Sequence, residues 1–128
     1  MKRVHKERLR LWVEDLRTTD AKQTRGVLRR EHGDTPGDCC LMRACVVYSR
    51  ETGKGRWDGR GFNDGVGGWD DTGLPFGVME WYGLEGVDPD IKVQGIPTAT
   101  CQRLNDGYGW TFGEIADALE KSYGLAQP

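Results

Sequence analysis

Residues 38–49, Asp38-Cys-Cys-Leu-Met-Arg-Ala-Cys-Val-Val-Tyr-Ser49, have the pattern of a helix at the centre of the fold. The pattern predicts a helix over 39–49, with small and apolar side chains recurring at the spacing of one helix face. That face consists of Leu41, Ala44, Cys45 and Tyr48. We expect Asp38 to be the N-cap, because an aspartate side chain accepts hydrogen bonds from the free backbone N–H groups of the first turn.

The same helix would carry two thiols, Cys39 and Cys40, in its first turn. Free N–H groups and the helix dipole favour a thiolate there, so either cysteine is a candidate nucleophile. A catalytic base would have to be His32, oriented by Asp34 or Asp38. The alternative is that both cysteines are small buried side chains, which is the commoner role of a free thiol.

The four cysteines, Cys39, Cys40, Cys45 and Cys101, follow no export signal, so we expect thiols rather than disulfides. A zinc ion would need a fourfold set such as His32, Cys39, Cys45 and Cys101. The spacing of these residues is not that of a zinc knuckle, which has two closely paired ligand sets. We therefore predict no metal and no cofactor.

Two segments before and after the central helix are also predicted to be helical. The segment 6–17 carries an apolar stripe of Leu9, Trp12, Val13 and Leu16, while its charged residues, Asp15 included, are expected to face water. A helix over 75–82 follows Leu74, buries Val78 and Trp81, and stops at Gly83.

The last helix has the clearest beginning and end. Thr111 and Glu114 have the spacing of a capping box, and Gly124 is placed to end a helix over 112–123 that buries Ile115 and Leu119. Between the helices we predict an extended or turn segment over 23–30, a short strand over 88–94 around Ile91 and Val93, and a short helical piece over 97–104.

The segment 52–73 is rich in glycine and aromatic residues, and it is predicted to be a loose hairpin or ordered loop. Asp58-Gly59 and Asn63-Asp64-Gly65 are turn signals within it. Aromatic side chains among glycines favour a contact surface for a partner or ligand.

Length and charge limit the class of protein. The 128 residues fit one domain, 1–128, and no apolar run is long enough to span a membrane, so we expect a cytoplasmic protein with no membrane partner.

Residues 1–30 carry a net charge of +6 and residues 31–128 a net charge of −8. A sequence pI near 5.7 makes nucleic acid an unexpected partner. A homo-oligomer is compatible with so small a core.

These elements predict an α+β fold that is mainly helical, a small single domain of four to five short helices with a glycine-rich hairpin or loop. The predicted core consists of Trp12, Leu16, Leu41, Cys45, Val78, Trp81, Ile115 and Leu119.

Several motifs, taken in order, resemble a family of small uncharacterised proteins from tailed phages and prophages. They are a Trp-containing first helix (Trp12), Gln-x-x-Gly-x-Leu at 23–28, Cys-Cys-Leu-x-x-x-Cys at 39–45, Leu-Pro-x-x-Val-x-x-Trp-x-Gly-Leu at 74–84, and Leu-Asn-Asp at 104–106 before Phe-x-x-Ile-Ala at 112–116. Met42 stands where the family usually has glycine. The resemblance implies a phage-encoded accessory protein acting in the bacterial host cell, without an established activity.

Three functions are compatible with these features. The first is a non-enzymatic binding module that captures a host protein or a small nucleotide. Its ligand-binding candidates are Arg25, Arg29, Arg30, Trp57, Arg60 and Trp69, together with Asn105 and Asp106, whose other role would be to close a helix. The second is the small cysteine-dependent enzyme described above. The third is a nucleic-acid-binding regulator, because residues 111–120 resemble the first helix of a helix-turn-helix, although a recognition helix would have to follow Gly124.

Overall fold

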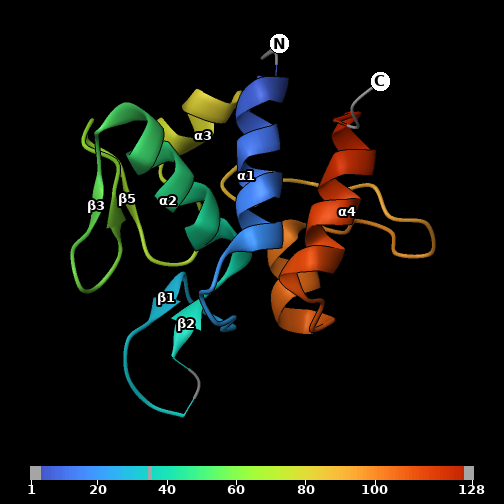
Figure 1. Ribbon diagram of the computed structural model, residues 1–128, viewed down its shortest axis with the longest axis horizontal. Helices are drawn as coiled ribbons and strands as arrows, with labels where there is room; N and C mark the ends of the chain where they lie inside the picture. The colour runs from blue at the N-terminus through green and yellow to red at the C-terminus, as the bar shows by residue number, and fades with distance from the viewer. Residues whose placement is uncertain (1–3, 35, 126–128) are drawn as a thin grey trace.

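Three helices form the frame of the molecule, and α1 lies between the other two (Figure 1). A computed structural model describes residues 4–34 and 36–125, and within them α1 (Lys6–Thr18) packs against α2 (Cys40–Thr52) on one side and α4 (Phe112–Tyr123) on the other. The shorter α3 (Phe76–Tyr82) lies across the upper end of α1 and α2.

The α1 helix buries the predicted stripe of Leu9, Trp12, Val13 and Leu16. The indole Nε1 of Trp12 donates a hydrogen bond of 3.0 Å to the carbonyl oxygen of Cys40, which fastens α1 to the start of α2. One prediction for α1 is wrong: Asp15 does not face water but is buried against α2.

The central helix begins one residue later than predicted and is capped differently. Cys39 is its N-cap residue and no side chain caps it, so the assignment of Asp38 as N-cap is wrong. Both Asp38 oxygens are instead occupied by arginines, as described below. At the other end Gly53 has a φ of 72°, a left-handed conformation that glycine adopts without steric cost and that ends the helix.

The α3 helix ends as the sequence predicted, at Gly83 in the left-handed conformation, with the N–H of Leu84 donating 3.0 Å to the carbonyl of Met79. Its buried face differs from the prediction. Tyr82, not Trp81, is fully buried, and its hydroxyl donates 2.7 Å to the carbonyl of Ala44. Trp81 packs at the edge of the core, where the guanidinium of Arg8 lies over its ring.

The α4 helix has both predicted ends: the capping box of Thr111 and Glu114 is formed, and Gly124 is left-handed. The segment before it differs. Residues 88–94 form no strand, only isolated bridges from Asp90 to Thr100 and from Val93 to Ile96. The helical piece predicted over 97–104 lies further on, at 101–107, and its last turn is η1 (Arg103–Gly107), a π-helical turn.

The strands are all two residues long. Strands β1 (Arg29–Arg30) and β2 (Gly37–Asp38) pair antiparallel, so the segment 23–30 is extended at its end, as predicted. Strands β3 (Arg56–Trp57), β4 (Phe62–Asn63) and β5 (Trp69–Asp70) form an antiparallel sheet in the order β3-β4-β5. The glycine-rich segment therefore contains the predicted hairpin, extended by a third strand.

The helices and the three-stranded sheet share one hydrophobic core, which confirms a mainly helical α+β fold. Seven of the eight predicted core residues are buried, and Trp81 is the exception. Across the described residues, no helix has the length and apolar character that crossing a membrane requires.

Candidate functional site

The arginines and tryptophans that the sequence singled out are brought together only in part. The guanidinium of Arg29 lies 5.6 Å from the ring of Trp57, but Arg29 also donates 2.7 Å to Asp38. The indole N–H of Trp57 donates to the carboxylate of Glu31. These groups thus bind one another and form no open ligand site.

The remaining candidates of this set are spread over the surface. Arg30 donates 3.2 Å to the hydroxyl of Thr24 and 3.0 Å to the carbonyl of Arg25. The indole N–H of Trp69 donates 2.9 Å to Asp58. The guanidinium of Arg25 lies beside Gly109, and Arg60 is exposed in the turn between β3 and β4. The structure therefore does not assemble these residues into one pocket.

Asn105 has a structural role in the interior of the protein. Its side chain is fully buried, accepts hydrogen bonds from the amide of Gln23 at 2.7 Å and the backbone N–H of Cys40 at 3.2 Å, and donates 2.9 Å to the carbonyl of Thr24. A second Asn105 donor bond reaches Asp106 at 2.8 Å. These bonds join η1 to the start of α2 and to the segment before β1, a structural role that differs from the predicted one of closing a helix.

The thiols do not have the environment of a nucleophile. All four are buried, and burial is the main cause that raises the pKa of Cys39, Cys40 and Cys45 well above the ordinary value. The start of α2 lies inside the core, where a charge is disfavoured, so the structure favours the alternative that Cys39 and Cys40 are small buried side chains.

The set considered for zinc is not assembled either. His32 is exposed in the turn between β1 and β2, whereas Cys39, Cys45 and Cys101 lie in the core. Among the described residues no group of three or more His, Cys, Asp or Glu side chains has the geometry to hold a metal ion.

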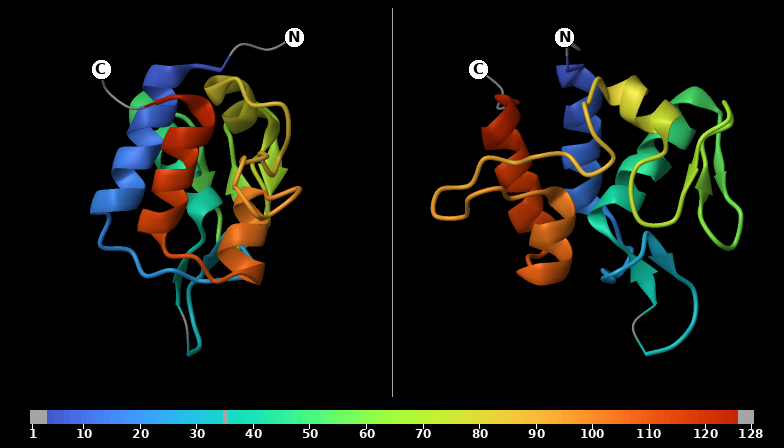
Figure 2. Two further views of the ribbon diagram at one scale, coloured as in Figure 1. Left: turned by 90° about the vertical axis from the view of Figure 1, so that its right-hand side faces the viewer. Right: turned by 180° about the vertical axis from the view of Figure 1, so that it is seen from behind.

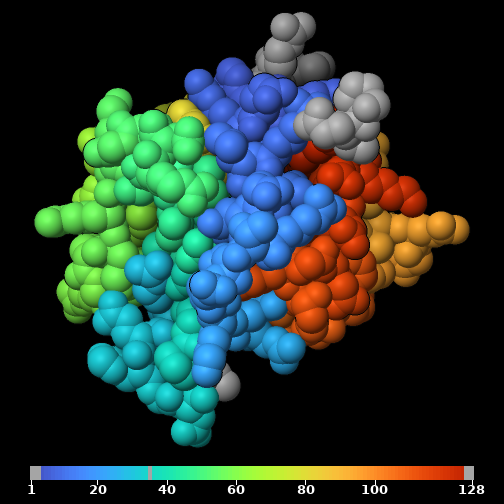
Figure 3. Space-filling view, viewed as in Figure 1, coloured from blue at the N-terminus to red at the C-terminus, as the bar shows by residue number. Residues whose placement is uncertain are grey.

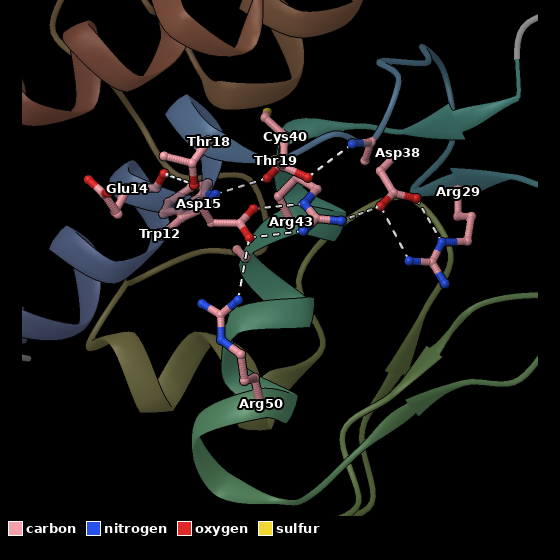
Figure 4. A network of polar contacts seen from close by, with 12 residues as sticks. Trp12, Glu14, Asp15, Thr18, Thr19, Arg29, Asp38, Cys40, Arg43 and Arg50 are labelled. Atoms are coloured by element: carbon pink, nitrogen blue, oxygen red, sulfur yellow. Dashed lines mark hydrogen bonds and ion pairs between the residues drawn. The ribbon is translucent and has the colours of Figure 1, made fainter.

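A buried network of charges joins α1, α2 and β2 (Figure 4). Arg43 is its centre: it donates to both oxygens of Asp15 and, from Nη1 at 2.9 Å, to Asp38, which also binds Arg29. Burial opposes the charge of Arg43, but the bonds to the two carboxylates outweigh it and raise the pKa of Arg43. Because every member has a partner, this network stabilises the fold and leaves no group free for chemistry.

A ligand-sized hollow lies elsewhere, between α4 and the hairpin-like segment 90–99. We call it the α4 groove. Its volume is about 1030 Å³, the size of a small-molecule site. Its wall is mostly apolar and includes Ile91, Val93, Ile96, Pro97, Trp110 and Ala118. In Figure 2 the segment 90–99, in light orange, stands away from the body of the molecule beside α4, and Figure 3 shows its side chains projecting at that edge.

Hydrogen bonds join the two sides of the groove at one end. The N–H of Lys92 donates 2.9 Å to the hydroxyl of Ser122, and the hydroxyl of Tyr123 donates 2.9 Å to the carbonyl of Asp90, so the first arm of the segment is fixed to the end of α4. The second arm includes Thr98, which has a φ of 55°. A left-handed threonine is strained, and such strain concentrates at functional sites.

Sequence reasoning missed this groove. The segment 90–99 was predicted to be part strand and part helix, and Trp110 was not considered. Its only sequence signal was the exposed i, i+3, i+4, i+7 face of α4, formed by Glu114, Asp117, Ala118 and Lys121.

Fold and groove together define a small, mainly helical α+β domain with a ligand-sized groove beside its last helix. The chain belongs to a family of domains of unknown function, DUF8296, whose sequence profile matches residues 1–123. A comparison with the curated proteins and one with the solved structures each find no match.

Proposed function

We propose that the protein is a phage-encoded accessory protein that acts in the cytoplasm of its bacterial host as a non-enzymatic binding module. Its ligand is a small molecule, such as a nucleotide, that occupies the α4 groove. The observation that carries this proposal is the groove itself, because its volume of about 1030 Å³ and its mostly apolar wall with a few charged groups are typical of small-ligand sites.

The other two functions have less support. A cysteine-dependent enzyme would need an accessible thiol beside a base, and the thiols are buried away from His32. A nucleic-acid-binding regulator would present mainly basic residues on the candidate helix, whereas the exposed face of α4 carries Glu114 and Asp117 beside a single basic residue, Lys121.

A photo-crosslinking residue placed at Val93, inside the groove, tests the proposal. In bacterial cells carrying the phage, we expect an adduct of a few hundred daltons on the Val93-substituted protein, and no adduct when the same probe replaces the exposed Lys54. The change Ala118→Trp fills the groove and should abolish the adduct. The groove is not the binding site if the probe at Val93 gives no adduct, or if it gives an adduct that Ala118→Trp does not remove.

Capture of a host protein is the second candidate, and exposed apolar side chains favour it. Val66 is 55% and Trp69 is 48% exposed in or beside the three-stranded sheet. The same crosslinker at Val66 separates the two functions. A protein-sized adduct at Val66, with no adduct at Val93, would mean that the protein captures a host protein and not a small ligand.

A further inference from the structure

The charged groups around the α4 groove differ between its two ends, and this difference indicates what its ligand carries. Lys121 is in the last turn of α4, and Lys92 neighbours the same turn through the bond from its N–H to Ser122. Both lysines line the groove and are exposed. Neither ammonium group donates a hydrogen bond or forms an ion pair with any residue in the described parts of the chain.

Two of the lining carboxylates, Glu114 and Asp117, are already engaged by other groups of the protein. Glu114 accepts the capping-box bond from the N–H of Thr111 at 2.9 Å, and Asp117 binds Arg17 at 2.8 Å. Asp90 lies near Lys92, and Asp117, one turn before Lys121, is paired with Arg17, so Lys92 and Lys121 are the two lining cations and neither has a partner among the described residues. An exposed cation without a partner is available to a ligand at little desolvation cost.

Apolar side chains also line the groove between Glu114 and Lys121. Ala118 lies one turn before Lys121, and the half-buried ring of Trp110 precedes α4. From Glu114 to Lys121 the helix rises about 10 Å, since each residue adds about 1.5 Å. This length suits a mononucleotide or a medium-length acyl chain.

We propose that the α4 groove binds a small amphiphilic anion, with its aromatic or apolar body against Trp110 and Ala118 and its anionic group between Lys92 and Lys121. This inference rests on the proposed function and narrows it to one ligand chemistry. Nucleotides and acyl carboxylates share that chemistry, so the experiment compares the two sources.

Four probe compounds distinguish the contribution of the anionic group from that of the apolar body. AMP is compared with adenosine, which lacks the phosphate, and decanoate is compared with decyltrimethylammonium, which has the opposite charge. Each is titrated into the full chain while the NMR signals of the Trp110 indole N–H and the Ala118 amide are followed. We expect AMP, decanoate or both to shift these signals saturably, and adenosine and decyltrimethylammonium to bind more weakly. The anion that binds identifies the source.

The lysines are then removed. The double change Lys92→Ala and Lys121→Ala should weaken anion binding about three- to tenfold, the effect of two partly exposed charge contacts. Lys54→Ala, between α2 and β3 on the other side of the molecule (Figure 1), should change nothing. Lys121→Arg keeps the charge and should retain most of the affinity.

Three results would overturn the inference. Binding that is blocked by Ala118→Trp but is equal for both signs of charge would leave the groove as a ligand site and remove its anion preference. If Ala118→Trp does not fold, Val93→Glu, at the tip of the segment 90–99, is a second variant that should block the groove. A dimer that these variants dissociate would mean that a second copy fills the groove. No shift with any probe, together with no Val93 crosslink, would remove the proposed function as well.

Discussion

Arg43 of α2 donates two parallel hydrogen bonds to Asp15 of α1, from Nε to Oδ2 at 2.7 Å and from Nη2 to Oδ1 at 2.9 Å. Both side chains are nearly inaccessible to water. Together with the bond from Trp12 to the carbonyl of Cys40, this bidentate pair joins α1 to α2, and the third Arg43 bond, to Asp38, adds β2 to the same unit.

Removing one member of this network should be strongly destabilising. We expect Arg43→Met to lower the free energy of unfolding by about 3–5 kcal/mol, because it leaves two buried carboxylates without their shared cation. Urea denaturation measures the change. Arg50→Met is the control, since Arg50 is 53% exposed and 3.7 Å from Asp15, and about 1 kcal/mol or less should be lost. Equal losses for the two variants would contradict the structural role of Arg43.

Asn105→Asp should destabilise the protein by about 2–4 kcal/mol although the shape of the side chain hardly changes. The new carboxylate cannot donate to the carbonyl of Thr24, and it would be buried next to Asp106. Asp106→Asn, which keeps an oxygen acceptor for Asn105, is the matched control and should cost much less. Thermal denaturation of the two variants checks the order, and a loss as small for Asn105→Asp as for Asp106→Asn would contradict the structural role of Asn105.

Two glycine changes in helices should have opposite effects. Gly113→Ala in α4 meets only ordinary contact, 3.9 Å from Thr111, and should stabilise by up to about 1 kcal/mol through helix propensity. Gly77→Ala in α3 would place its Cβ 2.7 Å from Asp64 Oδ2 and 2.6 Å from a Val66 methyl, so we expect a loss of about 1–3 kcal/mol. Denaturant titration compares them, and a stabilising Gly77→Ala would refute this close packing.

The four cysteines should react slowly with a thiol reagent in the native protein and rapidly in denaturant. They are buried, and burial raises the pKa of Cys39, Cys40 and Cys45, so few thiolates are present near neutral pH. The measurement is the time course of labelling, followed by mass spectrometry. Fast labelling of one cysteine in the folded protein would revive the enzyme hypothesis.

Alkaline pH should weaken the fold partly through Tyr123. Burial, with the nearby Cys101 and Asp90, raises the pKa of Tyr123 to about 12 from its usual value of 10.0. The contribution is complete below pH 10, and it is lost as the pH rises from 10 to about 12, because the unfolded chain ionises first. Stability of the wild type should therefore fall more steeply over this range than that of Tyr123→Phe. Parallel curves would show that Tyr123 titrates normally.

Local sequence determined the helices and several of their ends. The capping box of Thr111 and Glu114, the left-handed glycines at 83 and 124, and the apolar stripe of α1 all act within a few residues, so their effects can be recognised from spacing. The turn signals of the glycine-rich segment act over the same short range, and they predicted its hairpin.

Only the tertiary structure decided the burial of Asp15, the bonds of Asn105 and the α4 groove. Asp15 and Arg43 are 28 residues apart, and Asn105 meets Thr24 across 81. A charged residue on a helix is expected to face water unless a partner offsets its desolvation, and neither the partner nor the groove between α4 and 90–99 exists before the distant segments pack. Short-range patterns therefore specified the elements of this protein, and the pairing of remote polar groups specified how those elements meet.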